Sequence, residues 1–175
     1  MGADDALVNA AMRVIGANHY LTIGTVDPDG TPRLSPVRYG RIGHRRLCWG
    51  SMPSARHSLT IAARPEIRIV IFDSHAEDFQ GEGVFLAATA AEVAPDDLER
   101  VCSLLGSPDP ETFRGDSAFR LYQACITACD VHIGRFHPVC SDAASTSGKR
   151  YSSPTSRATH ASSETRRITV SSWTT

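Results

Sequence analysis

Long hydrophobic runs are missing from this chain of 175 residues, and so is any excess of basic charge, since it has 18 Lys and Arg against 19 Asp and Glu. No segment approaches the roughly 18 uninterrupted apolar residues of a transmembrane helix, so we expect none. The formal charge of −1 gives no reason to expect nucleic acid or an acidic membrane as a partner. Met1 to Asp5 lack the basic-then-apolar order of a signal peptide, which favours a cytoplasmic protein.

Cysteine is present in an odd number, and lysine occurs once, at Lys149. An odd cysteine count without a secretory signal favours reduced thiols over a disulfide framework. The five cysteines are Cys48, Cys102, Cys125, Cys129 and Cys140.

The composition changes after residue 140. Residues 141–175 contain 10 Ser and 7 Thr, with two acidic and five basic residues. The formal charge is therefore about −4 for residues 1–140 and +3 for the remainder. Such a composition buries too little apolar surface to offset the entropy of ordering. We predict a folded domain over 1–140 and a largely disordered, basic Ser/Thr-rich tail over 141–175.

Within residues 1–140, short runs of β-branched and aromatic residues alternate with turn signals. The tetrapeptide Asp27 to Gly30 favours a tight turn between two such runs. The pattern predicts a mainly β protein, an antiparallel barrel or sandwich with peripheral helices. We expect strands at 20–26, 33–39, 46–51, 67–72, 83–93 and 124–136, and helices at 4–17, 52–64, from 95 onward and at 116–123.

Hydroxyl and basic side chains gather where a predicted strand runs into a predicted helix, at residues 50–58. Free backbone N–H groups and the positive end of the dipole make a helix N-terminus suited to phosphate. Arg56 adds a guanidinium and His57 a ring nitrogen. Arg33 and Ser35 share a face of an earlier strand, and Arg38 points to the opposite face unless the strand bulges, as Pro36 could allow. The alternative is that these are solvated arginines and helix-capping serines.

The order of these elements resembles the pyridoxamine 5′-phosphate oxidase-like family, the flavin-binding split barrels, over roughly residues 6–135. Arg33 to Arg38 match the family motif R-x-x-x-x-K/R. Residues 50–61 stand where the family has Y-T-x-x-x-S-R-K-x-x-x-L, and Arg64-Pro65 stand where it has Asn-Pro.

The resemblance implies an antiparallel split β-barrel that binds FMN and forms a homodimer with the cofactor at the interface. Ser51, Arg56 and His57 would hold the flavin phosphate, with Arg33 and Ser58 as further candidates. Arg38 and the backbone near Ser35 would lie beside the isoalloxazine ring. The implied cofactor-binding residues are Arg33, Ser35, Arg38, Gly50, Ser51, Arg56, His57 and Ser58, and no catalytic residue is assigned.

The chain departs from the family pattern where pyridoxamine phosphate oxidases hold their substrate. Gly83 stands where they carry a glutamine, and Val139 stands where an arginine is expected. We therefore predict a flavin-dependent oxidoreductase that acts on an unidentified small molecule. Split barrels also include F420-using and haem-binding members, so the alternative is a non-catalytic protein that binds flavin, F420 or haem.

Soft metal ligands cluster near residue 130. The candidates are Cys125, Cys129, His132, His137 and Cys140. Zinc binds cysteine and histidine tetrahedrally, but this spacing matches no common zinc module. Buried thiols and surface histidines are the preferred interpretation, and a zinc-stapled interaction module is a further alternative.

Overall fold

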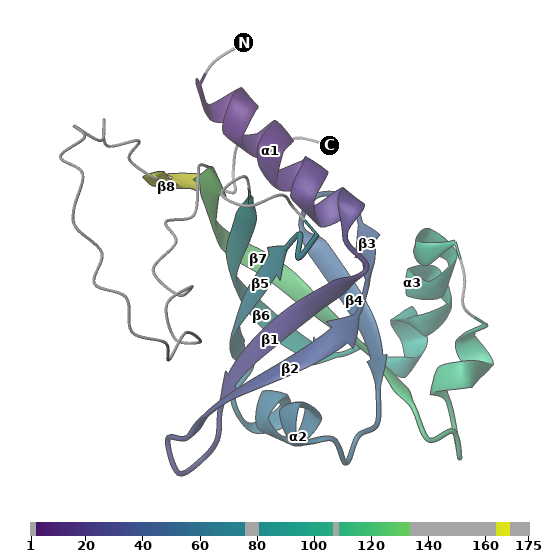
Figure 1. Cartoon of the computed structure of the whole chain (residues 1–175). Helices are drawn as coiled ribbons and strands as arrows, with labels where there is room; N and C mark the ends of the chain where they lie inside the picture. Colours follow the sequence, from purple (N-terminus) through teal and green to yellow (C-terminus); the bar gives the residue numbers. More distant parts are fainter. Residues whose placement is uncertain (1–2, 76–80, 107–108, 134–163, 169–175) are drawn as a thin grey trace, which may run out of the picture.

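A computed structural model describes residues 3–75, 81–106, 109–133 and 164–168 (Figure 1). The described residues form a mainly β structure with a few helices, which confirms the predicted class. The strands are β1 (Tyr20–Val26), β2 (Pro32–Arg38), β3 (Gly40–Ile42), β4 (Arg46–Ser51), β5 (Glu66–Phe72), β6 (Gly83–Glu92), β7 (Arg120–Ile133) and β8 (Glu164–Ile168).

The strands form one sheet whose pairings are antiparallel. Their order is β2-β1-β5-β6-β7-β4-β3, and β8 adds to β7. The sheet curls so that β2 and β4, far apart in this order, come close to each other. The result is the curled, split barrel that Figure 1 shows.

Helices close the ends of this barrel. In Figure 1, α1 (Ala3–Ala17) crosses one end and α2 (Arg56–Ala63) lies at the other, below β1 and β2. The helix α3 (Leu98–Leu105) lies outside the barrel, beside β3 and β4. Two short 3₁₀ helices, η1 (Pro95–Asp97) and η2 (Pro110–Phe113), flank α3 in sequence.

Two apolar cores result from the alternation of side chains along the strands. The larger core fills the barrel, with Leu21 and Ile23 of β1 facing Trp49 of β4 and the apolar face of α1. The smaller core lies between β4 and α3, and contains Cys48, Cys102 and Phe113. Residues of β4 thus face the barrel on one side and α3 on the other.

The prediction of a helix at residues 116–123 was wrong. Residues from Arg120 onward belong to β7, whose first half pairs with β4. The Arg120 guanidinium donates to the backbone carbonyls of Gly115, Ser117 and Phe119, and so fixes the turn before the strand. The pairing partner, β4, lies about 70 residues away in sequence and left no local signal.

Two further boundaries differ from prediction. Gly40–Ile42, which lie between two of the predicted strands, form the short strand β3. The helix expected from residue 52 begins at Arg56 instead. Met52 to Ala55 form a turn in which the Ala55 amide donates to the Met52 carbonyl at 3.0 Å.

The prediction of a disordered tail needs correction for Glu164–Ile168. These residues form β8, which pairs with Cys129–Ile133 of β7. Ile168 is buried, and the Arg167 guanidinium pairs with Asp130 at 2.9 Å. An unpaired edge of a long strand offers backbone partners that composition alone does not reveal. The remainder of the tail lies outside the described residues.

An irregularity in β7 separates two of the candidate metal ligands. The register between β6 and β7 shifts between Ala87 and Ala88, which leaves Thr127 as an extra residue. A bulge of this kind turns the following side chains to the opposite face. Cys125 is therefore exposed and Cys129 buried, although residues four apart on a regular strand would share a face.

Candidate functional site

A cavity of about 790 Å³ opens where β2, β4, α2 and α3 come together. Its volume lies within the range of small-molecule and cofactor sites. The residues that line it are Pro36, Val37, Arg38, Tyr39, Gly40, Cys48, Trp49, Gly50, Ser51, Met52, Ala55, His57, Leu105, Phe113, Phe119 and Leu121.

One part of the cavity is built by the end of β4 and the first turn of α2. The Ser51 hydroxyl and the Nε2 atom of His57 are 2.8 Å apart. Burial lowers the pKa of His57, so the imidazole is neutral at pH 7. The bonded pair therefore keeps one donor for an incoming anion: the Ser51 hydroxyl when His57 Nε2 donates to it, or His57 Nδ1–H when the hydroxyl donates to Nε2.

The N-terminus of α2 adds backbone donors at this place. Ala55 precedes the helix and contributes no side-chain cap. Leu59 is the first residue of α2 whose amide makes an intrahelical hydrogen bond. It donates to the Ala55 carbonyl at 3.0 Å. The preceding amides of the first turn have no intrahelical acceptor, which is the geometry that favours phosphate oxygens.

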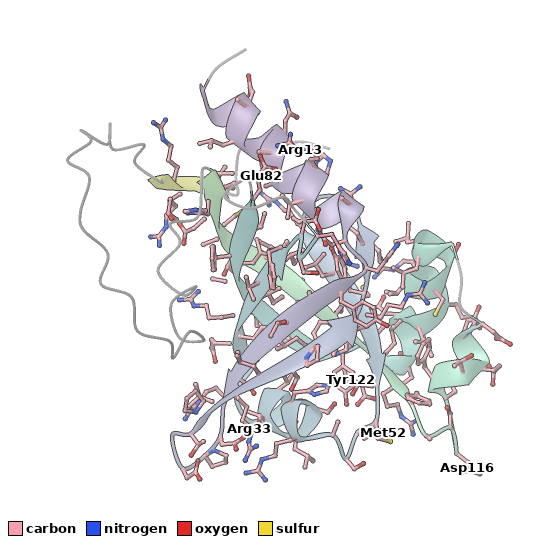
Figure 2. The ribbon with its side chains drawn as sticks, viewed as in Figure 1. Arg13, Arg33, Met52, Glu82, Asp116 and Tyr122 are labelled. Atoms are coloured by element: carbon pink, nitrogen blue, oxygen red, sulfur yellow. The ribbon has the colours of Figure 1, made fainter. Side chains whose placement is uncertain are left out.

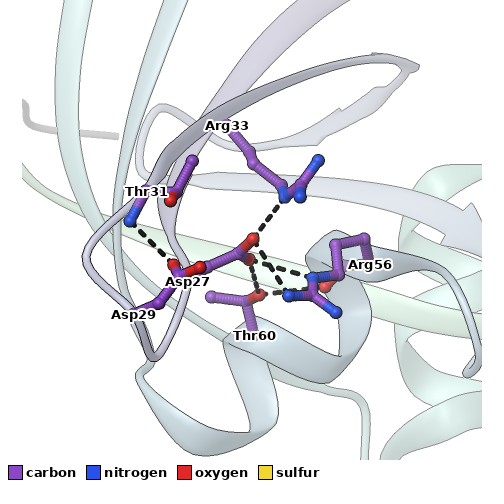
Figure 3. Close-up of polar contacts among 6 residues, drawn as sticks. All are labelled: Asp27, Asp29, Thr31, Arg33, Arg56 and Thr60. Atoms are coloured by element: carbon purple, nitrogen blue, oxygen red, sulfur yellow. Dashed lines mark hydrogen bonds and ion pairs between the residues drawn. The ribbon is translucent and has the colours of Figure 1, made fainter.

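A buried carboxylate beside the cavity binds two of the predicted site arginines. The side chain of Asp27 is 0% exposed. The Nε and Nη2 atoms of Arg56 donate to its two oxygens at 3.1 Å each. Arg33 Nε donates to Asp27 Oδ2, and Thr60 Oγ1 donates to Oδ1 at 3.1 Å (Figure 3). We call Asp27, Arg33, Arg56 and Thr60 the Asp27 cluster.

The Asp27 cluster retains a positive charge. Its hydrogen bonds from Arg56, Arg33 and Thr60 lower the pKa of Asp27 to about 2, so the carboxylate is ionised at neutral pH. Two guanidinium groups against one carboxylate leave a net charge of +1 on the cluster itself, and the nearby Asp29 carboxylate in the same turn reduces its effect. The arginine side chains are 48% and 55% exposed, so each keeps donors that face solvent. Figure 2 shows Arg33 near α2, and His57 follows Arg56 directly in that helix.

The structure brings together half of the predicted cofactor-binding residues. Arg38, Gly50, Ser51 and His57 line the cavity. Arg33 and Arg56 belong to the Asp27 cluster instead. The Ser58 hydroxyl is buried without a hydrogen-bond partner among the described residues, and Ser58 lines a separate pocket with Tyr122. Ser35 lines neither pocket.

Arg38 differs from the other two site arginines. It has no acidic partner within the described ranges, and it lines the cavity. The strand β2 pairs regularly with β1, with no bulge at Pro36. Arg33 and Arg38 therefore point to opposite faces of β2, as the alternation predicted.

Sequence reasoning missed the residues that complete the site. Asp27 was interpreted only as a turn residue, although it is the partner of two arginines. The wall of Leu105, Phe113 and Phe119 was also missed, because it comes from α3 and the segments after it. Trp49 lines the cavity but is also a core residue that stacks on Tyr122, with ring centroids 6.0 Å apart.

Within the described ranges, no three His, Cys, Asp or Glu side chains gather as metal ligands would. His137 and Cys140 of the candidate zinc cluster lie outside those ranges. Burial raises the pKa of Cys48 and of Cys129 to about 12, so both are neutral thiols. None of the described helices is long and apolar enough to cross a membrane.

No family model and no curated protein matches the chain. Solved structures do match. A haem-binding protein from Mycobacterium smegmatis superposes with a TM-score of 0.60 at 19% identity, covering 71% of this chain and 53% of that one. The present chain thus spans about half the length of that protein.

Two further solved structures share the fold. One is a protein from Clostridium acetobutylicum, related to general stress protein 26 and described as pyridoxinephosphate oxidase family. It superposes with a TM-score of 0.59 at 10% identity, covering 74% of this chain and 89% of that one. An F420 reductase superposes with a TM-score of 0.50 at 16% identity, covering 67% and 94%. The chain therefore has the split-barrel fold of the pyridoxamine 5′-phosphate oxidase-like proteins, as the sequence resemblance implied.

Proposed function

We propose that this protein binds FMN in the cavity between β2, β4 and α2, and acts as a flavin-dependent oxidoreductase in the cytoplasm. The observation that carries the proposal is the donor set at one part of the cavity: Ser51, His57 and the free amides of α2. The positively charged Asp27 cluster lies beside it. The cavity is lined by no carboxylate, and its volume is sufficient for a flavin nucleotide.

Each group has a definite task in this proposal. Ser51, His57 and the α2 amides hold the phosphate, and the solvent-facing donors of Arg33 and Arg56 offset its charge. Arg38 lies farther along the cavity, where it can face the ring system. A bound flavin supplies the electron-transfer chemistry, and the protein binds it, orients it and limits access of water. The substrate is a small molecule, considered further below.

Haem binding is the second candidate, because His57 and Met52 both line the cavity. Histidine and methionine side chains are common axial ligands of haem iron. His57 would first have to exchange its contact with Ser51 for the metal. The absorbance spectrum of the purified protein, before and after incubation with FMN, F420 or haem, separates these cases. We expect flavin bands with FMN. A Soret band that forms with haem, together with no uptake of FMN, would overturn the proposal.

We further propose that the protein is a homodimer. Large apolar side chains are exposed on the outer face of the sheet, at Tyr20, Leu34, Phe72 and Phe85. They come from four adjacent strands, and Leu34 and Phe85 also line a groove of about 410 Å³. Apolar side chains exposed on one face in this way favour a protein interface, and charged residues, Arg68, Asp130 and Arg167, line the same groove.

Leu34→Glu is expected to convert the dimer to a monomer, because it places a charge on this apolar face. Sedimentation velocity measures the change. Leu59→Glu is the matched control, since Leu59 is exposed on α2, away from that face. A monomeric wild-type protein, or a Leu34→Glu variant that remains dimeric, would contradict the assignment.

A further inference from the structure

The cavity has an apolar wall on the side of α3 that flavin phosphate binding does not use. Leu105 comes from α3, Phe113 from η2, and Phe119 from the segment just before β7. Phe113 is nearly buried, whereas Phe119 is 47% exposed. The wall therefore presents aromatic and aliphatic surface to whatever enters beside the cofactor.

Two glycines keep this wall tight against the sheet. A Cβ atom at Gly40 would lie 2.8 Å from Leu105 Cδ2, and one at Gly50 would lie 3.0 Å from Phe113 Cε1. Contacts under about 3.4 Å force a neighbour to move. The apolar side chains can pack directly on the backbone of β3 and β4 only because both positions lack a side chain. Phe113 belongs to the smaller core and Leu105 packs against it, so this part of the wall is held in place by that core.

The cavity carries charge of one sign only, which is positive. No carboxylate lines it, and Arg38 is its one lining residue that carries a full charge at neutral pH. His57 is neutral there, and so is the Cys48 thiol, whose pKa burial raises to about 12. An unpaired guanidinium beside an apolar surface attracts anions and repels cations, and apolar walls focus that field.

We propose that the small molecule taken up beside the flavin is a planar aromatic acid. Its ring packs on Leu105, Phe113 and Phe119, and its carboxylate or phenolate oxygen accepts hydrogen bonds from Arg38. This inference rests on the proposed function for its place beside the cofactor, while the wall and the charge stand on the geometry alone.

The test compares 2-naphthoate with its cationic analogue 2-naphthylmethylamine, by calorimetry on the FMN-loaded protein. We expect the acid to bind at least about tenfold more tightly than the amine. Arg38→Gln should remove this preference. Phe119→Ala should weaken naphthoate binding about tenfold, because it removes a large apolar contact. Phe119 is half-exposed, so the variant should fold, which a melting curve checks.

Leu104→Ala is the control, because Leu104 is the exposed neighbour of Leu105 on α3 and does not line the cavity. Its naphthoate affinity should equal that of the wild type. An amine that binds as tightly as the acid, or a Phe119→Ala variant with unchanged naphthoate affinity, overturns the inference while FMN binding stands. If FMN does not bind at all, the same titrations on the protein without cofactor decide the inference separately.

Discussion

Replacing Asp27 by asparagine is expected to lower the melting temperature at pH 7 by roughly 10 °C, because an amide in the place of the buried carboxylate leaves some of the cluster's hydrogen-bond donors unsatisfied. The substitution keeps the size of the side chain but removes the charge that Arg33 and Arg56 share. The single oxygen of an asparagine amide can accept fewer hydrogen bonds than the four that Arg33, Arg56 and Thr60 donate to the carboxylate. Thermal unfolding followed by circular dichroism gives the measurement.

The loss of melting temperature caused by Asp27→Asn should become smaller at acidic pH. The pKa of Asp27 is lowered from 3.8 to about 2 in the folded protein. A carboxylate with a depressed pKa stabilises the fold above its unfolded pKa, and this contribution is lost as the pH falls through the folded value. The difference in melting temperature between wild type and Asp27→Asn should therefore shrink between pH 3.8 and pH 2. The control is Asp29→Asn, in the same turn but exposed. Equal effects of the two substitutions would refute the role of the Asp27 cluster.

Arg56→Ala is expected to weaken FMN binding about tenfold, because it removes a positive charge that offsets the charge of the phosphate at the start of α2. Riboflavin, which lacks the phosphate, should bind this variant as well as it binds the wild type. The variant also loses two hydrogen bonds to Asp27 and so melts earlier. Fluorescence titrations are therefore made well below its melting temperature, with riboflavin as the internal measure of an intact cavity.

Arg64→Ala is the matched control for Arg56→Ala, because Arg64 follows the last turn of the same helix and is exposed. Arg64→Ala should leave the affinities for FMN and for riboflavin unchanged. If Arg56→Ala left FMN affinity at the wild-type value, or weakened riboflavin to the same extent, the phosphate would not lie at the N-terminus of α2.

Much of the barrel could be predicted because its strands carry local signals. The alternation in β1 and the β-branched run of β5 both reflect burial of one face, and the turn from Asp27 to Gly30 has its own chemistry. The errors in the predicted strands occurred where the pairing strand is distant in sequence. The start of β7 is a strand because β4 is available to pair with it, and β8 forms on an edge of β7 that is more than 30 residues away in sequence.

The candidate site shows the same limit. Ser51 and His57 could be placed together because they flank one strand-to-helix turn. Asp27 could not be predicted as the partner of Arg33 and Arg56. It lies 29 residues before Arg56, and pairing of charges leaves no periodic pattern in the sequence. The wall of Leu105 and Phe113 depends on α3 packing over two glycines, which only the folded arrangement reveals.

The proposal that this split barrel holds FMN by its phosphate is tested most directly by titrating the cofactor-free wild-type protein with FMN and with riboflavin. We expect saturable quenching of flavin fluorescence at one FMN per chain, with riboflavin binding at least about tenfold more weakly. The absence of saturable FMN binding, or equal affinities for the two flavins, would contradict the account.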